Sequence, residues 1–172
     1  MPKYYVAFID RPRHHMVIPM KAMLNPYNQQ AAFCAGMPQF FGGTDDHNQP
    51  PAQVLEMEVM QESRGTLELT SGSPRNFYTE GNMFFYYALE SQWTATGTPW
   101  GAASNPEQQE MDRLVTIDLS RFASDMTDAA IITELARQSG SNLGTPGGTQ
   151  FQQSATRQAF IRLIRGFLAG TL

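Results

Sequence analysis

The stretch from Gly42 to Gly65, GGTDDHNQPPAQVLEMEVMQESRG, constrains this chain more than any other. A glycine pair opens it, an acidic polar loop follows, and two prolines lead into a short segment of helical pattern. A helix turns about 100° per residue, so Glu58 and Glu62 lie about 40° apart on one face. Like charges at this spacing repel by roughly 0.2–0.5 kcal/mol, and a cation between them reverses the sign. Because carboxylate oxygens suit Mg²⁺ or Mn²⁺, the segment predicts a divalent-metal site.

This segment resembles the Nudix box, GG-x5-E-x7-R-E-U-x-E-E-x-G-U with U aliphatic, which forms a loop, a helix and a second loop. Gly43 matches the box glycine, Glu58 the glutamate after the arginine, and Glu62 the second of the paired glutamates. The box glycine near the end comes one residue late, at Gly65. The sequence also departs from the box where it has Gln49, Met57, Gln61 and Arg64 in place of Glu, Arg, Glu and Gly.

The resemblance implies Mg²⁺- or Mn²⁺-dependent hydrolysis of a nucleoside diphosphate linked to another group, so the expected partner is a nucleotide-type small molecule. It implies that the metal is held by Glu58, Glu62, Gln61 and a backbone carbonyl at Gly43. In the family a further acidic ligand or general base often comes from the loop before a later strand. Glu110 is the first candidate here, and Glu107 and Asp112 follow it.

Substrate contacts are expected from Arg64 and from two tryptophans, Trp93 and Trp100. Both tryptophans fall in residues 91–108, which are poor in aliphatic residues and predict a long loop. A tryptophan in such a loop either stacks on a nucleobase or covers the edge of the core, and the sequence leaves both interpretations open.

The departures from the box keep two other classes of protein in view. One is a Nudix-like module that binds nucleotides or proteins without turnover, favoured by Gln49, Met57 and Gln61. The other is a structural or interaction protein of unrelated α/β fold, in which Glu58 and Glu62 are only part of a solvated helix face. Metal binding and a panel of nucleotide substrates would separate the three.

Composition excludes several functions and leaves others open. The 172 residues predict one domain, 1–172, with a full core. A net charge of −4 gives no general attraction to nucleic acid or to anionic membranes. No apolar run approaches the roughly 20 residues of a membrane span, and no signal peptide opens the chain. The single Cys34 cannot form an internal disulfide and is expected to be a buried apolar residue, which fits a cytoplasmic protein. A homodimer is left open.

The order of elements predicts an α/β fold, namely a Nudix-like α/β/α sandwich with a mixed sheet and additional C-terminal helices at about 124–172. Strands are expected at 4–9 and 15–20 as a hairpin, at 66–70, at 83–89 in the sheet interior, and at 114–119. Pro19 argues that the second of these strands is an edge strand or ends early. Helices are expected at 128–138 and 155–168, and residues 139–150 as a flexible glycine-rich lid or linker.

The helix of the box has its own expected details. Asn48 is expected to cap it, with Pro50 and Pro51 in the first turn. Its apolar side is expected to carry Val54, Leu55, Met57 and Val59.

Overall fold

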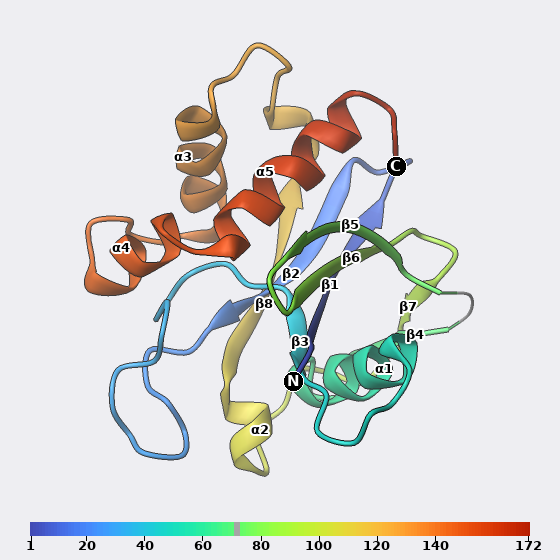
Figure 1. Cartoon of the computed structure of the whole chain (residues 1–172), viewed down its shortest axis with the longest axis vertical. Coiled ribbons are helices and arrows are strands. Elements are labelled where there is room, and N and C mark those ends of the chain that lie inside the picture. The colour runs from blue at the N-terminus through green and yellow to red at the C-terminus, as the bar shows by residue number, and fades with distance from the viewer. Residues whose placement is uncertain (71–72) are drawn as a thin grey trace.

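A six-stranded mixed sheet forms the middle layer of the protein (Figure 1). The computed structural model describes residues 1–70 and 73–172. The strands of this sheet are β1 (Lys3–Asp10), β2 (His15–Lys21), β3 (Phe41–Thr44), β5 (Arg75–Glu80), β6 (Met83–Ala88) and β8 (Met111–Asp118). Their order is β5-β6-β1-β2-β8, with β3 also paired to β1. The pair β1–β6 is parallel and the other pairs are antiparallel, so the sheet is mixed as expected.

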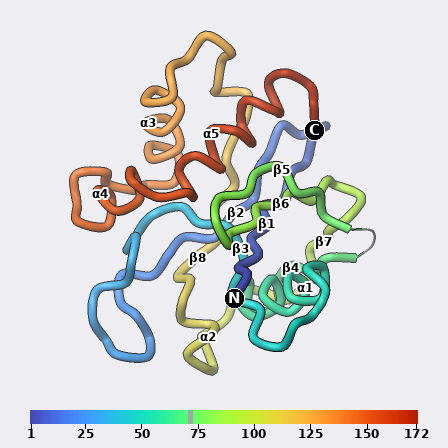
Figure 2. Tube along the Cα trace, in the orientation of Figure 1, coloured from blue at the N-terminus to red at the C-terminus, as the bar shows by residue number. Residues whose placement is uncertain are grey.

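Helices cover both faces of the sheet (Figures 1 and 2). On one face lies α1 (Pro51–Glu62), together with a two-stranded sheet of β4 (Leu67–Leu69) and β7 (Trp93–Ala95). On the other face lie α3 (Asp128–Ser139), α4 (Pro146–Gln152) and α5 (Ala155–Leu168). The short α2 (Pro106–Gln109) precedes β8, and a 3₁₀ turn at Leu119–Arg121 follows it. The protein is therefore an α/β/α sandwich with additional C-terminal helices, as the sequence predicted.

The central strand β1 supplies side chains to both cores because successive residues of a strand point to opposite faces. Ala7 and Ile9 belong to the larger core under α3, α4 and α5. Val6 and Phe8 belong to the smaller core under α1. The smaller core holds the box helix α1 against the sheet.

The first two strands form the predicted hairpin, but β2 is not an edge strand. It pairs with β1 only from His15 to Val17 and with β8 along its whole length. Pro19 therefore lies beyond the β1 ladder, opposite Leu114 of β8, and its carbonyl accepts a hydrogen bond from the Gln39 backbone. A proline fits inside the sheet here because the neighbour on one side changes from strand to loop.

The box helix begins and packs differently from the prediction in two details. Pro50 stands at the cap position and Pro51 begins the helix, whereas Asn48 lies two residues earlier in a left-handed conformation. Met57 is 44% exposed and does not belong to the apolar side. It follows the buried Leu55 by two residues, which is about 200° around the helix, so the two side chains point in nearly opposite directions.

Residues 139–150 are more ordered than the sequence predicted. Thr145 caps α4, and its hydroxyl oxygen accepts a hydrogen bond from the Gly148 backbone. A Cβ on Gly147 would lie 2.8 Å from the backbone nitrogen of Ala35, so this glycine allows two backbones to pack closely. The cluster SGSPRN at 71–76 predicts a turn, which begins in residues outside the described part of the chain. Residues 91–108 were predicted to be one long loop, but they contain the strand β7 and most of α2.

Two further expectations can be compared with the structure. The single Cys34 is buried and free, and burial raises the pKa of its thiol to about 11, which suits an inert core residue. Among the described residues, no helix combines the length and the apolarity that crossing a membrane requires.

Candidate active site

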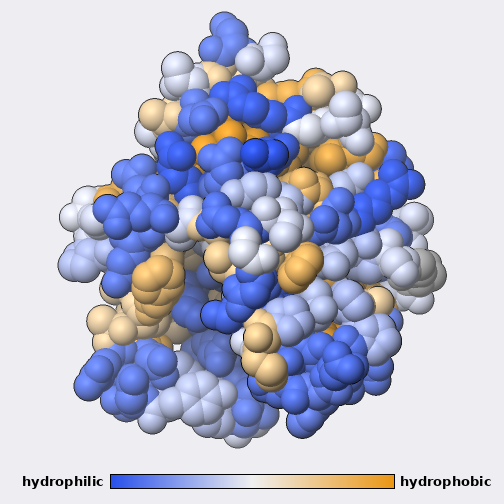
Figure 3. Space-filling model, in the orientation of Figure 1, coloured by the Kyte–Doolittle hydropathy of each residue, from blue (hydrophilic) through white to orange (hydrophobic). Residues whose placement is uncertain are grey.

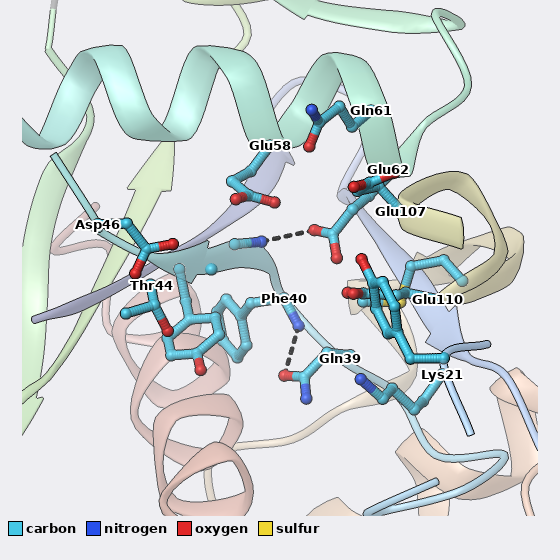
Figure 4. A pocket seen from close by; sticks show the side chains of 15 residues that line it. Lys21, Gln39, Phe40, Thr44, Asp46, Glu58, Gln61, Glu62, Glu107 and Glu110 are labelled. Atoms are coloured by element: carbon cyan, nitrogen blue, oxygen red, sulfur yellow. Dashed lines mark hydrogen bonds between the residues drawn. The ribbon is translucent and has the colours of Figure 1, made fainter. Parts of the chain in front are cut away.

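A cavity of about 440 Å³ lies beside α1, β3 and the start of β8 (Figure 4). It brings together residues that are far apart in the sequence. The residues lining it are Tyr5, Lys21, Tyr27, Gln39, Phe40, Gly42, Gly43, Thr44, Asp46, Glu58, Gln61, Glu62, Glu107, Glu110 and Met111. The predicted metal ligands and the predicted acidic residue Glu110 therefore share one cavity, while Arg64, Trp93 and Trp100 do not line it.

The glycine pair lies at two close approaches, one to backbone and one to the end of a side chain. A Cβ on Gly42 would lie 2.8 Å from the Cα of Tyr5 in the neighbouring strand β1. A Cβ on Gly43 would lie 2.7 Å from the carboxyl carbon of Glu58 on α1. Since real Cβ atoms essentially never come this close, Gly42 lets β3 pair with β1 and Gly43 leaves room for the Glu58 carboxylate.

Glu62 is a buried acid with half of its hydrogen-bonding capacity unused. Its side chain is 1% exposed, and Oε1 accepts a hydrogen bond of 2.7 Å from the Gly42 backbone N–H (Figure 4). Its other oxygen, Oε2, has no hydrogen-bond partner although it is fully buried. Burial and the nearby Glu58 raise the pKa of Glu62 well above the usual range. Such an atom is a free oxygen ligand in the wall of the cavity.

The other carboxyl groups of the cavity affect one another in the same way. Burial, followed by the charges of Glu110, Asp46 and Glu107, raises the pKa of Glu58 to about 7. Burial also raises the pKa of Glu110, while Lys21 acts in the opposite direction. In Figure 4, Glu58 reaches from α1 toward β3, and Glu107 and Glu110 come from the segment before β8. The cavity thus concentrates acidic groups that share one small volume.

Sequence reasoning missed several of the residues that line the cavity. Asp46 comes from the loop after β3, and Lys21 ends β2. Lys21 is the one basic side chain among the described residues of this wall. Tyr5, on β1, has its pKa raised to about 12 by burial and by the charges of Glu62, Glu58 and Glu110. Of these residues, only Asp46 lies in a segment, the acidic loop 44–46, that stands out in the sequence. Tyr5 reaches the cavity because β1 pairs with β3, and no local sequence pattern indicates that pairing.

Arg64 contributes to structure at the end of α1. Its guanidinium donates hydrogen bonds to the backbone carbonyls of Gln108, Gly101 and Met111 at 3.2, 2.8 and 3.0 Å. It also lies 4.2 Å from the ring centroid of Trp100. Arg64 has a φ of 54°, in the left-handed region, at the position where the box has glycine. The bonds to segment 101–111 oppose the cost of that backbone conformation.

Trp93 covers the smaller core, which is the second of the two interpretations left open by the sequence. Its ring stacks on Phe8 with centroids 5.0 Å apart and an interplanar angle of 8°. The indole N–H donates a hydrogen bond of 3.2 Å to the Ile9 carbonyl. One ring face and the polar atom of Trp93 are therefore used within the fold. Its contact with a substrate stays a prediction.

The predicted metal ligands do not form a complete cluster of charged groups. Among residues 1–70 and 73–172, no three Asp, Glu, His or Cys side chains are arranged to hold a metal ion. The predicted set differs from such a cluster because it combines two carboxylates with the neutral oxygens of Gln61 and the Gly43 backbone. The geometry on its own defines an α/β/α sandwich with an acidic cavity beside a glycine pair.

Comparison with known proteins extends this description only at the level of the fold. No protein-family model matches the sequence, and no curated protein matches it significantly. Among solved structures, one from a study of MutT from Aliivibrio salmonicida and Vibrio cholerae has a TM-score of 0.46 at 13% identity, covering 79% of this chain and 97% of that one.

Two further solved structures are similar to the same extent. An ADP-ribose pyrophosphatase from Streptococcus suis has a TM-score of 0.42 at 13% identity over 70% of this chain and 75% of its own. The E. coli ORF135 protein has a TM-score of 0.39 at 17% identity over 69% and 74%. At such values the similarity concerns the general course of the chain and carries no information on activity.

Proposed function

We propose that this protein is a Mg²⁺-dependent hydrolase that cleaves the pyrophosphate bond of a nucleoside diphosphate linked to another group. The observation that carries the proposal is the buried carboxylate of Glu62, whose Oε2 has no partner in the wall of an acidic cavity. Leaving a buried charge-bearing oxygen unpaired costs a protein stability, so such an atom suggests a ligand. Its position four residues after Glu58, next to the glycine pair, is the arrangement of the Nudix box.

The donor atoms of the cavity fit Mg²⁺ or Mn²⁺. These ions prefer oxygen ligands, and Mg²⁺ is usually bound through one or two carboxylates while water and substrate phosphates complete its shell. Glu58 and Glu62 supply the carboxylates, and Gln61 and the Gly43 backbone supply neutral oxygens. Because Gly43 has no side chain, a phosphate can come close to Glu58. Burial is the main reason that the pKa values of both acids are raised, and neighbouring carboxyl groups add to the effect, so a cation in the cavity would favour the ionised forms of both.

The residues of the chain then divide the chemistry between them. When bound, the divalent ion supplies Lewis-acid polarisation of a phosphoryl oxygen. Glu110, which lines the same cavity, is placed to accept a proton from water, and Glu58 is the alternative base. The water oxygen forms a bond to phosphorus, the bond from phosphorus to the bridging oxygen breaks, and the second phosphate leaves. Lys21 offers a positive charge to the departing phosphate.

The departures from the box predict a slow enzyme. Gln61 removes one negative charge from the site, so a second or third metal ion binds more weakly. Met57 replaces the arginine that braces the catalytic glutamate in the family, and its side chain is exposed. Contact with Gly43 takes over part of the positioning of Glu58. The same exposed Met57 favours the second candidate, a nucleotide-binding module without turnover. The cytoplasmic location and the single domain are predictions as well, and a homodimer is left open.

The test is a hydrolysis assay with ADP-ribose, dinucleotides and nucleoside triphosphates, with MgCl₂ or with EDTA. We expect release of nucleoside monophosphate or phosphate that requires the metal and falls at least about 100-fold in Glu58→Gln and Glu62→Gln. Glu56→Gln is the matched control, because Glu56 is an exposed acid on the same helix outside the cavity. Equal activity in the parent and both cavity variants refutes the proposal. Metal binding without turnover of any compound identifies the binding module.

A further inference from the structure

Residues 22–36 form an ordered, hairpin-like loop beside the acidic cavity. Backbone hydrogen bonds close it at its base, from Gly36 to Lys21, and again toward the tip, from Ala32 to Met23. The Cys34 backbone N–H also donates a hydrogen bond of 2.9 Å to the Gln150 side chain of α4. Figures 1 and 2 show this loop as an excursion at the lower left of the molecule. It is therefore a fixed part of the fold and can hold side chains in defined positions.

The loop exposes rings that the fold does not use. Tyr27 is 61% exposed and Phe33 65% exposed. Within the described residues, neither ring takes part in an aromatic pair, whereas Tyr5 on β1 stacks on Phe85. Leu24, half exposed, adds to this apolar surface. The Tyr27 side chain has a hydrogen bond with Glu107, which leaves the face of its ring uncovered. Rings with exposed faces on a fixed loop are suited to contact a ligand.

These rings line a second cavity that continues from the acidic one. The second cavity has a volume of about 170 Å³ and is lined by Lys21, Leu24, Asn25, Pro26, Tyr27, Ala32, Phe33 and Glu110. Lys21, Tyr27 and Glu110 line both cavities, so the two are contiguous. In Figure 3 the surface is hollowed between the lower left, where the loop lies in Figure 1, and the part over α1 at the lower right. Whole ligands usually occupy about 300–1,000 Å³, so the second cavity suits one part of a ligand.

We propose that the second cavity is the subsite for the nucleobase of the substrate, with Tyr27 and Phe33 as its stacking surfaces. This inference rests on the proposed function in taking the ligand to be a nucleotide. The base stacks on the two rings, and the phosphate chain passes Lys21 into the acidic cavity toward Glu58. Stacking tolerates any base because every base has a π face. Asn25 and Glu110 lie in the wall, where their polar atoms can contact the edge of the base.

The charges of the two cavities support this direction of binding. The acidic cavity carries several carboxyl groups and one lysine, so without a divalent ion it repels phosphate. The second cavity has one acid, Glu110, beside Lys21, and its remaining walls are apolar or neutral. A neutral planar base therefore fits the second cavity, whereas the phosphate end requires the metal-loaded first one.

The test measures binding of AMP, adenosine and ribose 5-phosphate by ligand-observed NMR in EDTA, where no hydrolysis can occur. We expect adenosine to bind the parent, AMP to bind it more weakly because the metal-free acidic cavity repels its phosphate, and ribose 5-phosphate not to bind. Tyr27→Ala and Phe33→Ala should each weaken adenosine binding about 5- to 100-fold, as loss of one stacking ring predicts. Tyr27→Phe should bind like the parent because it keeps the ring. Met23→Ala is the matched control, an exposed apolar residue of the same loop that does not line either of these cavities.

The outcomes separate this inference from the proposed hydrolysis. Ring-dependent adenosine binding in a protein that hydrolyses nothing supports the subsite and refutes the enzyme. With an active enzyme, Tyr27→Ala should raise KM about tenfold for ADP-ribose and leave KM for 5-phosphoribosyl pyrophosphate, which has no base, unchanged. Adenosine binding that is absent in the parent, equal in parent and Tyr27→Ala, or lost in Tyr27→Phe overturns the inference. All of these side chains are exposed, so their truncation leaves the melting temperature nearly unchanged.

Discussion

Replacing Glu58 with glutamine is expected to remove a loss of stability that the metal-free protein suffers as the pH rises. Burial and the neighbouring acids raise the pKa of Glu58 from 4.5 to about 7. The folded protein therefore holds this proton more tightly than the unfolded chain does. The contribution of Glu58 to the free energy of unfolding is fully present below pH 4.5 and is lost as the pH rises through about 7.

The size of the effect follows from the shift in pKa. At about 1.4 kcal/mol per unit, a rise from 4.5 to about 7 corresponds to about 3 kcal/mol for a group fully shielded from water. The cavity is open to solvent on one side, which reduces the effect to roughly 1–3 kcal/mol. Glutamine has nearly the same volume and no charge, so it keeps the packing against Gly43 and removes the titration.

The assay is urea unfolding at about pH 5, 6, 7 and 8 in EDTA for the parent, Glu58→Gln and the exposed-acid control Glu56→Gln. We expect the parent and the control to lose stability together over this range and Glu58→Gln to lose roughly 1–3 kcal/mol less. Adding about 10 mM MgCl₂ should stabilise the parent more at pH 8 than at pH 5, because metal ligands must be deprotonated. Parallel curves for the parent and Glu58→Gln, or equal stabilisation of both by Mg²⁺, would refute the reasoning.

Other positions give sharper local tests. Gly43→Ala should lower the free energy of unfolding by about 1–3 kcal/mol and weaken metal binding, because its Cβ overlaps the Glu58 carboxyl group. Gly101 has open space around it, so Gly101→Ala should change stability by less than about 0.5 kcal/mol in denaturant unfolding. Arg64→Gly should lower stability by about 1–3 kcal/mol although it relieves the positive φ, because three hydrogen bonds to carbonyls are lost; a stabilised variant would contradict this account. Trp93→Ala should cost about 2–4 kcal/mol with no change in KM, and a selective rise in KM would assign it to substrate instead.

The spacing of apolar residues predicted the long, regular helices and strands. The apolar stripe of Phe160, Leu163 and Ile164 predicted α5, and these residues are buried as expected. The aromatic run at 83–88 predicted a strand of the sheet interior, and β6 lies between β1 and β5. Threonine before a helical segment favours a helix cap, and the hydroxyl oxygen of Thr127 accepts a hydrogen bond from the Ala130 backbone at the start of α3.

The predictions that failed concern segments whose contacts are made with distant parts of the chain. Pro19 indicates an edge only while its strand is imagined alone, and the early end of the β1–β2 pairing is a property of the sheet. The glycines at 147–148 suggest flexibility, but in the fold Gly147 packs against Ala35 and Gly148 against Leu143. Lys21 and Tyr27 could not be assigned to a site because the topology, and no local pattern, brings them to the acidic cavity.

The central claim is that Glu58 and Glu62 together hold one divalent ion beside the glycine pair. Titration of Mn²⁺ into the protein at pH 8, followed through the electron paramagnetic resonance signal of free Mn²⁺, tests this claim directly. The account predicts that the parent and Glu56→Gln bind the ion equally, while Glu58→Gln and Glu62→Gln each bind it at least tenfold more weakly. A parent protein that leaves all Mn²⁺ free, or a Glu62→Gln variant that binds it as tightly as the parent, would contradict the account.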